Sequence, residues 1–168
     1  MKRPAMLGWG LLAAAIVLAA DQASKYWIVN VLDLPSLGSV ELLSWLNLTM
    51  VWNQGVTFGL LRQGSVTGTY VLAGVSMLVV CFLLAWMARA ERVLLAVALG
   101  AVAGGAVGNV LDRLRFGRVV DFIHAHAFGY SWYVFNVADA AIVCGVAVLI
   151  LDGLLPQRSR LQAPGVPQ

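Results

Sequence analysis

Four apolar segments of membrane-spanning length limit what this chain can fold into. They cover residues 5–29, 66–88, 93–111 and 134–155, and a spanning helix needs about 20 mainly apolar residues. Hydrophobic residues make up 61% of the 168-residue chain, charged residues only 11%, and the mean hydropathy is +0.85. Since soluble domains carry roughly a quarter charged residues, the sequence predicts an α-helical integral membrane protein with four transmembrane helices.

The first segment has an alternative interpretation. Its basic start, apolar run and Ala-x-Ala spacing also fit a secretory signal peptide. However, the apolar pattern resumes after Lys25 as YWIV, which favours a helix that continues across the membrane. We therefore expect one membrane-embedded domain over residues 1–156, followed by a cytoplasmic tail over residues 157–168.

The distribution of basic residues predicts the orientation. With both termini in the cytoplasm, residues 36–65 and 112–133 become the outer loops, and the short ARAER turn lies inside. Six basic residues then lie inside (Lys2, Arg3, Arg89, Arg92, Arg158, Arg160) and five outside (Lys25, Arg62, Arg113, Arg115, Arg118). The five outer cations cluster with acids, and the net charge of +3 contains no basic block, so no nucleic-acid partner is expected.

The outer segment between the first two spans contains a strand-like pattern. Residues 45–53, WLNLTMVWN, partly alternate between apolar and polar side chains, and a period of two predicts a β-strand at the outer surface. Trp and Tyr residues here and at 26–27 and 130–133 are typical of a membrane–water interface. An amphipathic anchor without further function would explain these aromatics equally well.

Small and metal-ligating side chains have mainly structural interpretations. Gly100, Gly104 and Gly108 repeat every fourth residue, so they predict one helix face that a neighbouring backbone can approach closely. The two cysteines, Cys81 and Cys144, lie in apolar runs and are expected to act as small buried hydrophobes. His124 and His126 lack a suitable third ligand, so no metal site is predicted.

Polar residues gather at one membrane face in this topology. Charges at membrane depth are costly and usually face a cavity or the bundle interior, so a cluster of them marks a functional site by default. Simpler interpretations remain for parts of this cluster. The residues at 21 and 25 could form an i, i+4 ion pair, those at 136 and 139 a capping box, and those at 112 and 113 an interfacial patch. The cluster comprises Asp21, Lys25, Asn53, Asn109, Asp112, Arg113, Asp121, Asn136 and Asp139.

An acid pair is the chemistry that this cluster offers. Two carboxylates that are close together and partly out of water cannot easily both ionise, so one proton is shared. The ionised acid can then activate water while the protonated acid donates to a carbonyl oxygen. The chain contains no GxSxG, HExxH or Walker motif, which leaves the acids as candidates.

Five blocks of sequence resemble a known family. They are DQASK (21–25), NQGVTF (53–58), GGAVGNVLDR (104–113), VVDF (119–122) and FNVAD (135–139). In this order they are similar to the signature blocks of bacterial lipoprotein signal peptidase, or signal peptidase II. The resemblance implies a four-helix membrane bundle with a small extracytoplasmic β-cradle and a short helix in the outer loops.

The resemblance also implies an activity. The implied protein is an aspartic endopeptidase of the bacterial inner membrane. Such an enzyme cuts diacylglyceryl-modified prolipoproteins just before the lipidated cysteine, at the periplasmic face. The matching positions make Asp121 and Asp139 the catalytic pair. We expect no cofactor or metal, and a monomer that works among membrane lipids. The residues implied to line or order the site are Asp21, Lys25, Asn53, Gly55, Asn109, Asp112, Arg113 and Asn136.

Other functions would leave different traces in the sequence. A small proton-coupled carrier predicts acids near the bilayer midplane, and a non-catalytic subunit predicts that Asn could replace both acids. A presenilin-like protease needs a Gly-x-Gly-Asp element, which is absent. Gly55 and Gly59 in the first outer loop make a flap over the site conceivable.

Overall fold

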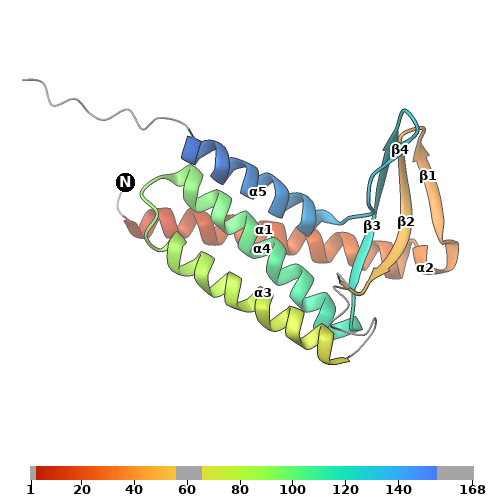
Figure 1. The fold of residues 1–168 in the computed structure, drawn as a ribbon, viewed down its shortest axis with the longest axis horizontal. Coiled ribbons are helices and arrows are strands. Elements are labelled where there is room, and N and C mark those ends of the chain that lie inside the picture. Colours follow the sequence, from red (N-terminus) through yellow and green to blue (C-terminus); the bar gives the residue numbers. More distant parts are fainter. Residues whose placement is uncertain (1–2, 56–65, 155–168) are drawn as a thin grey trace, which may run out of the picture.

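The computed structural model describes residues 3–55 and 66–154, and Figure 1 shows long helices side by side with a sheet across one end. The long helices are α1 (Arg3–Tyr26), α3 (Val66–Met87), α4 (Val93–Phe116) and α5 (Val137–Leu154). A π-helix, η1 (Trp27–Val31), continues α1. All four are long and apolar enough to cross a membrane, so the predicted four-helix fold is confirmed. Residues 59 and 157–168, on which the flap and tail predictions depend, lie outside the described residues.

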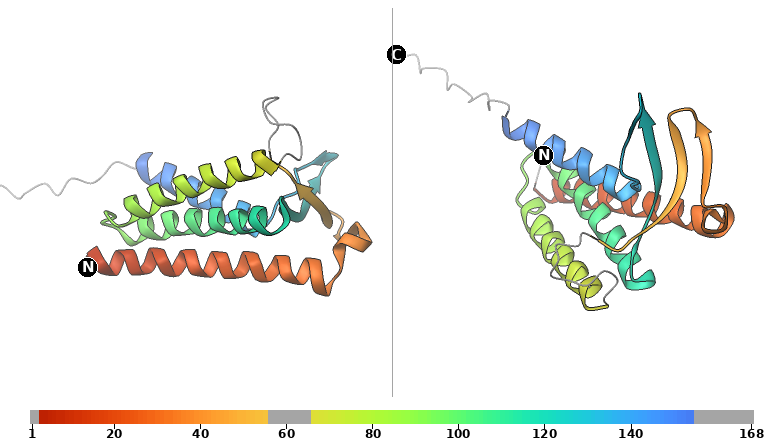
Figure 2. Two further views of the ribbon diagram at one scale, coloured as in Figure 1. Left: turned by 90° about the horizontal axis from the view of Figure 1, so that it is seen from below. Right: turned by 45° about the vertical axis from the view of Figure 1, so that its right-hand side comes forward.

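Helix α4 is the centre of the bundle and is longer than the apolar pattern indicated. It extends to Phe116 instead of residue 111 and ends at Gly117, whose φ is +70°. Glycine adopts this left-handed conformation readily and is common just after a helix. In Figure 2, α4 lies between α1 and α3. Of its most apolar 18-residue stretch, 61% is buried, against 17–22% for the other three long helices. Asn109 and Asp112, near its C-terminal end, are buried inside the protein.

The sheet is antiparallel and takes strands from two distant segments. Its order is β1 (Ser39–Leu43), β2 (Leu46–Asn53), β3 (Val119–Ala127) and β4 (Tyr130–Ser131). Strand β2 confirms the strand predicted over residues 45–53, and α2 (Leu34–Leu37) is a short helix between η1 and β1. The cradle was expected within residues 36–65, but two strands come from 119–131, which were predicted as a loop. Strand β3 begins with four buried residues, so it has no alternation for sequence reasoning to detect.

Two apolar clusters hold these parts together. One lies among the helices and includes Met6, Leu83, Met87 and Leu99. The other lies under the sheet, where Ile28, Leu34, Leu48, Val120 and Phe122 pack together. The second cluster joins η1 and α2 to β2 and β3, and because η1 continues α1, the strand that carries Asp121 is fixed against the helix bundle.

The glycine stripe of α4 permits close contact with α1. A Cβ atom at Gly100 would lie 2.0 Å from the Gly10 carbonyl oxygen, and one at Gly104 would lie 2.4 Å from the Ala14 carbonyl oxygen. Neither distance is sterically possible without moving a helix backbone. The packing role predicted for the stripe is therefore confirmed.

Gly104→Ala should lower the free energy of unfolding by about 1–3 kcal/mol, because the added methyl group must push α1 away from α4. Gly74→Ala in α3 is the matched control, since nothing lies within 4 Å of a Cβ there and Ala favours a helix more than Gly does. Denaturation in detergent would measure both. Equal stability of the two variants would contradict the close-packing argument.

The prediction that Cys81 and Cys144 are buried is wrong. Both side chains are exposed on the outside of the helices. In a membrane this outer surface faces lipid, and lipid accepts a small apolar side chain as readily as the protein interior does. Apolar character alone therefore does not indicate burial in such a bundle.

Candidate active site

Asp121 lies near the start of β3 and is buried, with 1% of its surface exposed. Asn53 Nδ2 donates to Asp121 Oδ2 at 2.8 Å, and Asn136 Nδ2 donates to Asp121 Oδ1 at 2.6 Å. Each carboxyl oxygen thus accepts one amide N–H. The site therefore holds this side chain in one orientation.

The protonation of Asp121 is shifted toward neutral pH. Burial is the main cause that raises the pKa of Asp121 to about 6, and the charge of Asp139 acts in the same direction. The hydrogen bonds from Asn53 and Asn136 and the charge of Lys25 oppose the rise. A carboxyl group with this pKa can both hold and release a proton near neutral pH.

Asp139 lies in the first turn of α5, where the helix dipole favours a negative charge. Asn109 Nδ2 donates to its Oδ1 at 2.8 Å. Asn136 and Asp139 also form the predicted capping box: the Asp139 N–H donates to Asn136 Oδ1 at 2.9 Å, and the Asn136 N–H donates to Asp139 Oδ2 at 3.3 Å. The cap and the acid cluster are therefore the same structure, rather than alternatives.

The amide groups of Asn109 and Asn136 link the two acids. Lys25 Nζ donates to Asn109 Oδ1 at 3.2 Å. An ammonium group can only donate, so the Asn109 amide must turn its NH₂ toward Asp139. Asn136 Oδ1 accepts the helix N–H described above, which turns its NH₂ toward Asp121 and, at 3.2 Å, toward Asn109 Oδ1. Each acid therefore receives an N–H from an amide whose orientation is set elsewhere.

A turn at the end of β2 orients Asn53 in the same way. The Gly55 N–H donates to Asn53 Oδ1 at 2.8 Å, and the φ of Gly55 is +91°. This leaves Asn53 Nδ2 to donate to Asp121. Gly55 thus acts on the site through Asn53, and its positive φ is a conformation that glycine adopts without strain.

A buried charge cluster lies behind the amides. Lys25 Nζ is 2.9 Å from Asp21 Oδ2, as the i, i+4 spacing predicted, and 2.7 Å from Asp112 Oδ2. The other Asp21 oxygen accepts the Ala138 N–H at 3.0 Å, and Asp112 Oδ2 accepts the Val120 N–H at 3.1 Å. Through these contacts α1 and α4 hold the start of α5 and the start of β3, which carry the two acids.

Sequence reasoning did not single out Gln22. Its Nε2 donates to Asp112 Oδ1 and Asp21 Oδ2, both at 3.1 Å, and its Oε1 accepts from Arg115 at 2.9 Å. It therefore forms a second bridge, beside Lys25, between the two buried carboxylates. The only sequence signal was its place between Asp21 and Lys25 in the DQASK block.

Arg113 is half-buried at the edge of the site. Its Nη1 donates to the Asn109 carbonyl oxygen at 3.2 Å, one turn back in α4. It forms no ion pair with Asp112, because Lys25 occupies that position. The hydrogen bond of Arg113 therefore goes to the backbone of Asn109, whereas the contacts that hold the Asp112 side chain come from Lys25 and Gln22.

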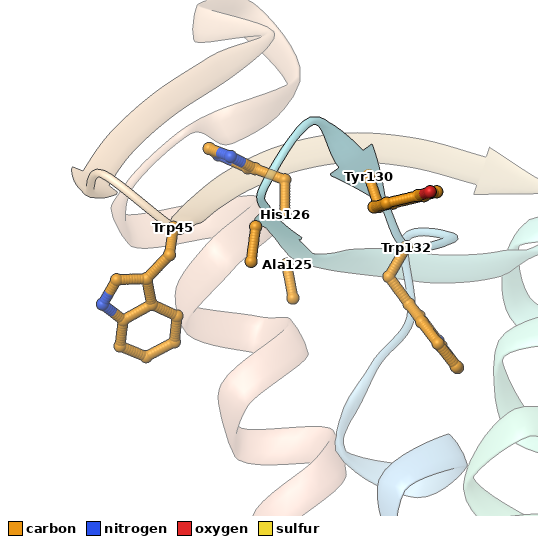
Figure 3. A pocket seen from close by; sticks show the side chains of 6 residues that line it. Trp45, Ala125, His126, Tyr130 and Trp132 are labelled. Atoms are coloured by element: carbon orange, nitrogen blue, oxygen red, sulfur yellow. The ribbon is translucent and has the colours of Figure 1, made fainter.

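The histidines and the cavity beside them lie outside this cluster. A cavity of about 330 Å³ near the end of the sheet is lined by Trp45, His126, Tyr130 and Trp132 among others, and Figure 3 shows the Trp45 and Trp132 rings extending to the same side of the hairpin. No candidate site residue lines it. Within residues 3–55 and 66–154, no group of three or more His, Cys, Asp or Glu side chains could hold a metal ion.

Comparison with known proteins identifies the family to which the chain belongs. The family model described as signal peptidase (SPase) II matches residues 13–155, a range that includes every candidate site residue. The chain belongs to the signal peptidase II family. It is 49% identical to the lipoprotein signal peptidase of Methylobacterium sp. (strain 4-46), over 89% of this chain and 90% of the relative. It is 50% identical to that of Methylorubrum extorquens (strain PA1), over 88% of this chain and 86% of the relative.

Solved structures agree with this assignment. Two structures described as bacterial membrane enzymes, determined by the in meso method at 2.3 Å and 1.9 Å, superpose with TM-scores of 0.76 and 0.75. The first is 28% identical, over 93% of this chain and 94% of that one; the second is 31% identical, over 89% and 94%. This signal peptidase II family member is therefore a bacterial membrane protein and a peptide-bond hydrolase. Nothing in these comparisons supports a carrier.

Proposed function

We propose that this protein is an aspartic endopeptidase that cuts diacylglyceryl-modified prolipoproteins just before the lipidated cysteine, with Asp121 and Asp139 as its catalytic pair. Membership of the signal peptidase II family establishes the broader activity, the removal of signal peptides in lipoprotein maturation. The observation that carries the finer proposal is the linked pair of amides. Asn136 and Asn109 each donate to one acid and hydrogen-bond to each other.

The reaction requires one proton on the acid pair. The ionised carboxylate removes a proton from a water molecule, whose oxygen then bonds to the scissile carbonyl carbon. At the same time the protonated carboxyl donates its proton to the carbonyl oxygen, which gives a tetrahedral diol. When the C–N bond breaks, the leaving nitrogen accepts a proton from the first acid, and the diol returns its proton to the second. The pair thus regains its starting protonation.

The position of the acids suits a membrane-bound substrate. They belong to β3 and to the first turn of α5, and the sheet and the start of α5 lie at the end of the bundle opposite the N-terminal end of α1 (Figure 1). In the proposed orientation this end faces the periplasm of the inner membrane and both termini lie in the cytoplasm. The exposed Trp45, Tyr130 and Trp132 of the sheet then contact lipid head groups. We propose that one monomer suffices, since all residues that hold the two acids come from this chain.

The direct test is a cleavage assay with the purified full-length protein in detergent. A diacylglyceryl-modified prolipoprotein should be cut once, and the product mass should place the cut just before the lipidated cysteine. The same precursor without the lipid is the matched control and should be cut far more slowly. A cut at another bond, or equal cutting of both precursors, would overturn the proposed specificity.

Raising the pH should destabilise the wild-type protein more than the Asp121→Asn variant. The pKa of an Asp in an unfolded chain is about 4, whereas the pKa of Asp121 in the folded protein is about 6. Between these two pKa values the folded state therefore binds more protons than the unfolded state. The free energy of unfolding falls as the pH rises through this range, by on the order of 2–3 kcal/mol. The variant lacks this titration. Thermal unfolding from pH 4 to 8 would measure the difference, and parallel curves would contradict it.

A further inference from the structure

Three arginines, none in a salt bridge within the described residues, surround the C-terminal end of α4. None of Arg113, Arg115 and Arg118 forms an ion pair within the described residues, where the ion pairs join Lys25 to Asp21 and Asp112, and Arg92 to Asp152. All eight Asp and Glu residues of the sequence lie in the described part of the chain. The charges of Asp139, Asp112 and Asp121 act on Arg113, whereas the exposed Arg118 can receive a counter-charge from outside the protein.

Two of these arginines line a cavity between the start of α3 and the end of α4. Its volume is about 250 Å³, and Thr69 and Tyr70 contribute hydroxyl groups to it. Its wall is well defined, because Thr69 Oγ1 donates to the Gly117 carbonyl oxygen at 3.0 Å. The Arg118 guanidinium carbon lies 5.4 Å from the centre of the Trp52 ring, a cation–π contact that restricts its orientation.

Part of the lining is apolar and faces outward. Leu114 and Phe116 line the same cavity and are 55% and 44% exposed, and Tyr70 is 59% exposed. Both helices cross the membrane, so these side chains lie where α3 and α4 leave the hydrocarbon layer. Aromatic residues at this depth are typical of the membrane–water interface. The cavity therefore combines hydrogen-bond donors and positive charge with an edge that contacts lipid.

We propose that this cavity binds the phosphate group of an anionic membrane phospholipid through Arg118 and Arg113. Arginine donates two parallel hydrogen bonds to phosphate oxygens, which makes it the preferred residue for phosphate recognition. The acyl chains would extend past Leu114 and Phe116 into the bilayer. This function is separate from peptide cleavage, although Arg113 connects the cavity to the acid pair through Asn109.

Lipid binding to matched variants of the full-length protein would test this site. Phosphatidylglycerol is titrated into the detergent-solubilised protein, and native mass spectrometry counts the bound lipid. Arg118→Gln should bind roughly tenfold more weakly, because it loses a charge-assisted contact. Arg115→Gln is the control: it removes the same charge from the same end of α4, but Arg115 lines a different cavity, so its affinity should stay within about twofold of wild type.

Other outcomes would overturn the proposal. Equal weakening in both variants would mean that the lipid responds only to net charge. Unchanged binding in Arg118→Gln would mean that the lipid lies elsewhere. Inorganic phosphate is the probe for the alternative source of the ligand: displacement of the lipid by phosphate at equal concentration would show a site for the free anion. None of these outcomes would bear on the proposed cleavage of prolipoproteins, because Arg118 contacts neither acid.

Discussion

Asp121→Asn and Asp139→Asn should each lower cleavage of a diacylglyceryl-modified precursor by about 10²- to 10⁴-fold. This is the usual contribution of a positioned general acid or base. An amide has the shape of a carboxyl group but cannot accept the proton from water or donate one to the carbonyl oxygen. Because the acids act as a pair, the double variant should be little slower than either single variant. Single-turnover rates of cleavage would measure all three.

Asp33→Asn is the matched control for these variants. Asp33 is an exposed acid between η1 and α2, with φ +52°, a conformation that Asn also tolerates. The Asp33→Asn variant should cleave the precursor at the wild-type rate. Thermal unfolding of each variant must show a folded protein, so that lost cleavage reports lost chemistry. Wild-type cleavage by folded Asp121→Asn or Asp139→Asn would refute the catalytic pair while leaving the family assignment intact.

Lys25→Met should lower the free energy of unfolding by about 3–5 kcal/mol. Lys25 is 4% exposed and lies within 3 Å of one oxygen of Asp21 and one of Asp112. Its removal leaves two buried carboxylates without a counter-charge, which is among the costliest changes in a protein interior. It also releases the Asn109 amide, which could then turn away from Asp139. Urea or thermal denaturation in detergent would measure the loss.

Two further variants test the reason for this effect. Arg115→Met removes a cation from the same end of the bundle, but Arg115 is exposed, so stability should change by no more than about 0.5 kcal/mol. Adding Asp112→Asn to Lys25→Met should restore part of the lost stability, because it removes one of the unpaired charges. If Lys25→Met were no worse than Arg115→Met, the charge cluster would not be what holds α1 and α4 to the strand and helix that carry the acids.

Local patterns were sufficient for the helices and for one strand. A run of apolar residues is enough to predict a membrane-spanning helix. The glycines of α4 indicate a closely packed neighbour, because every fourth residue lies on one helix face. Residues 45–53 partly alternate because the face of β2 that carries Leu48 is more buried than the face that carries Val51 and Asn53. The same logic failed for β3. Its first four residues are all buried, so the strand that carries Asp121 looked like a loop next to a helix.

The sequence by itself determined the four spans, the residue types of the site and, through ordered blocks, the family. Only the tertiary structure decided which atoms meet. Asn53 and Asp121 are 68 residues apart and Gln22 and Asp112 are 90 apart, and no local periodicity can encode such pairs. The orientation of each asparagine amide likewise depends on a third group, such as Lys25 Nζ at Asn109 Oδ1. Apolar length is a property of one segment, whereas a hydrogen-bond network exists only after distant segments have packed together.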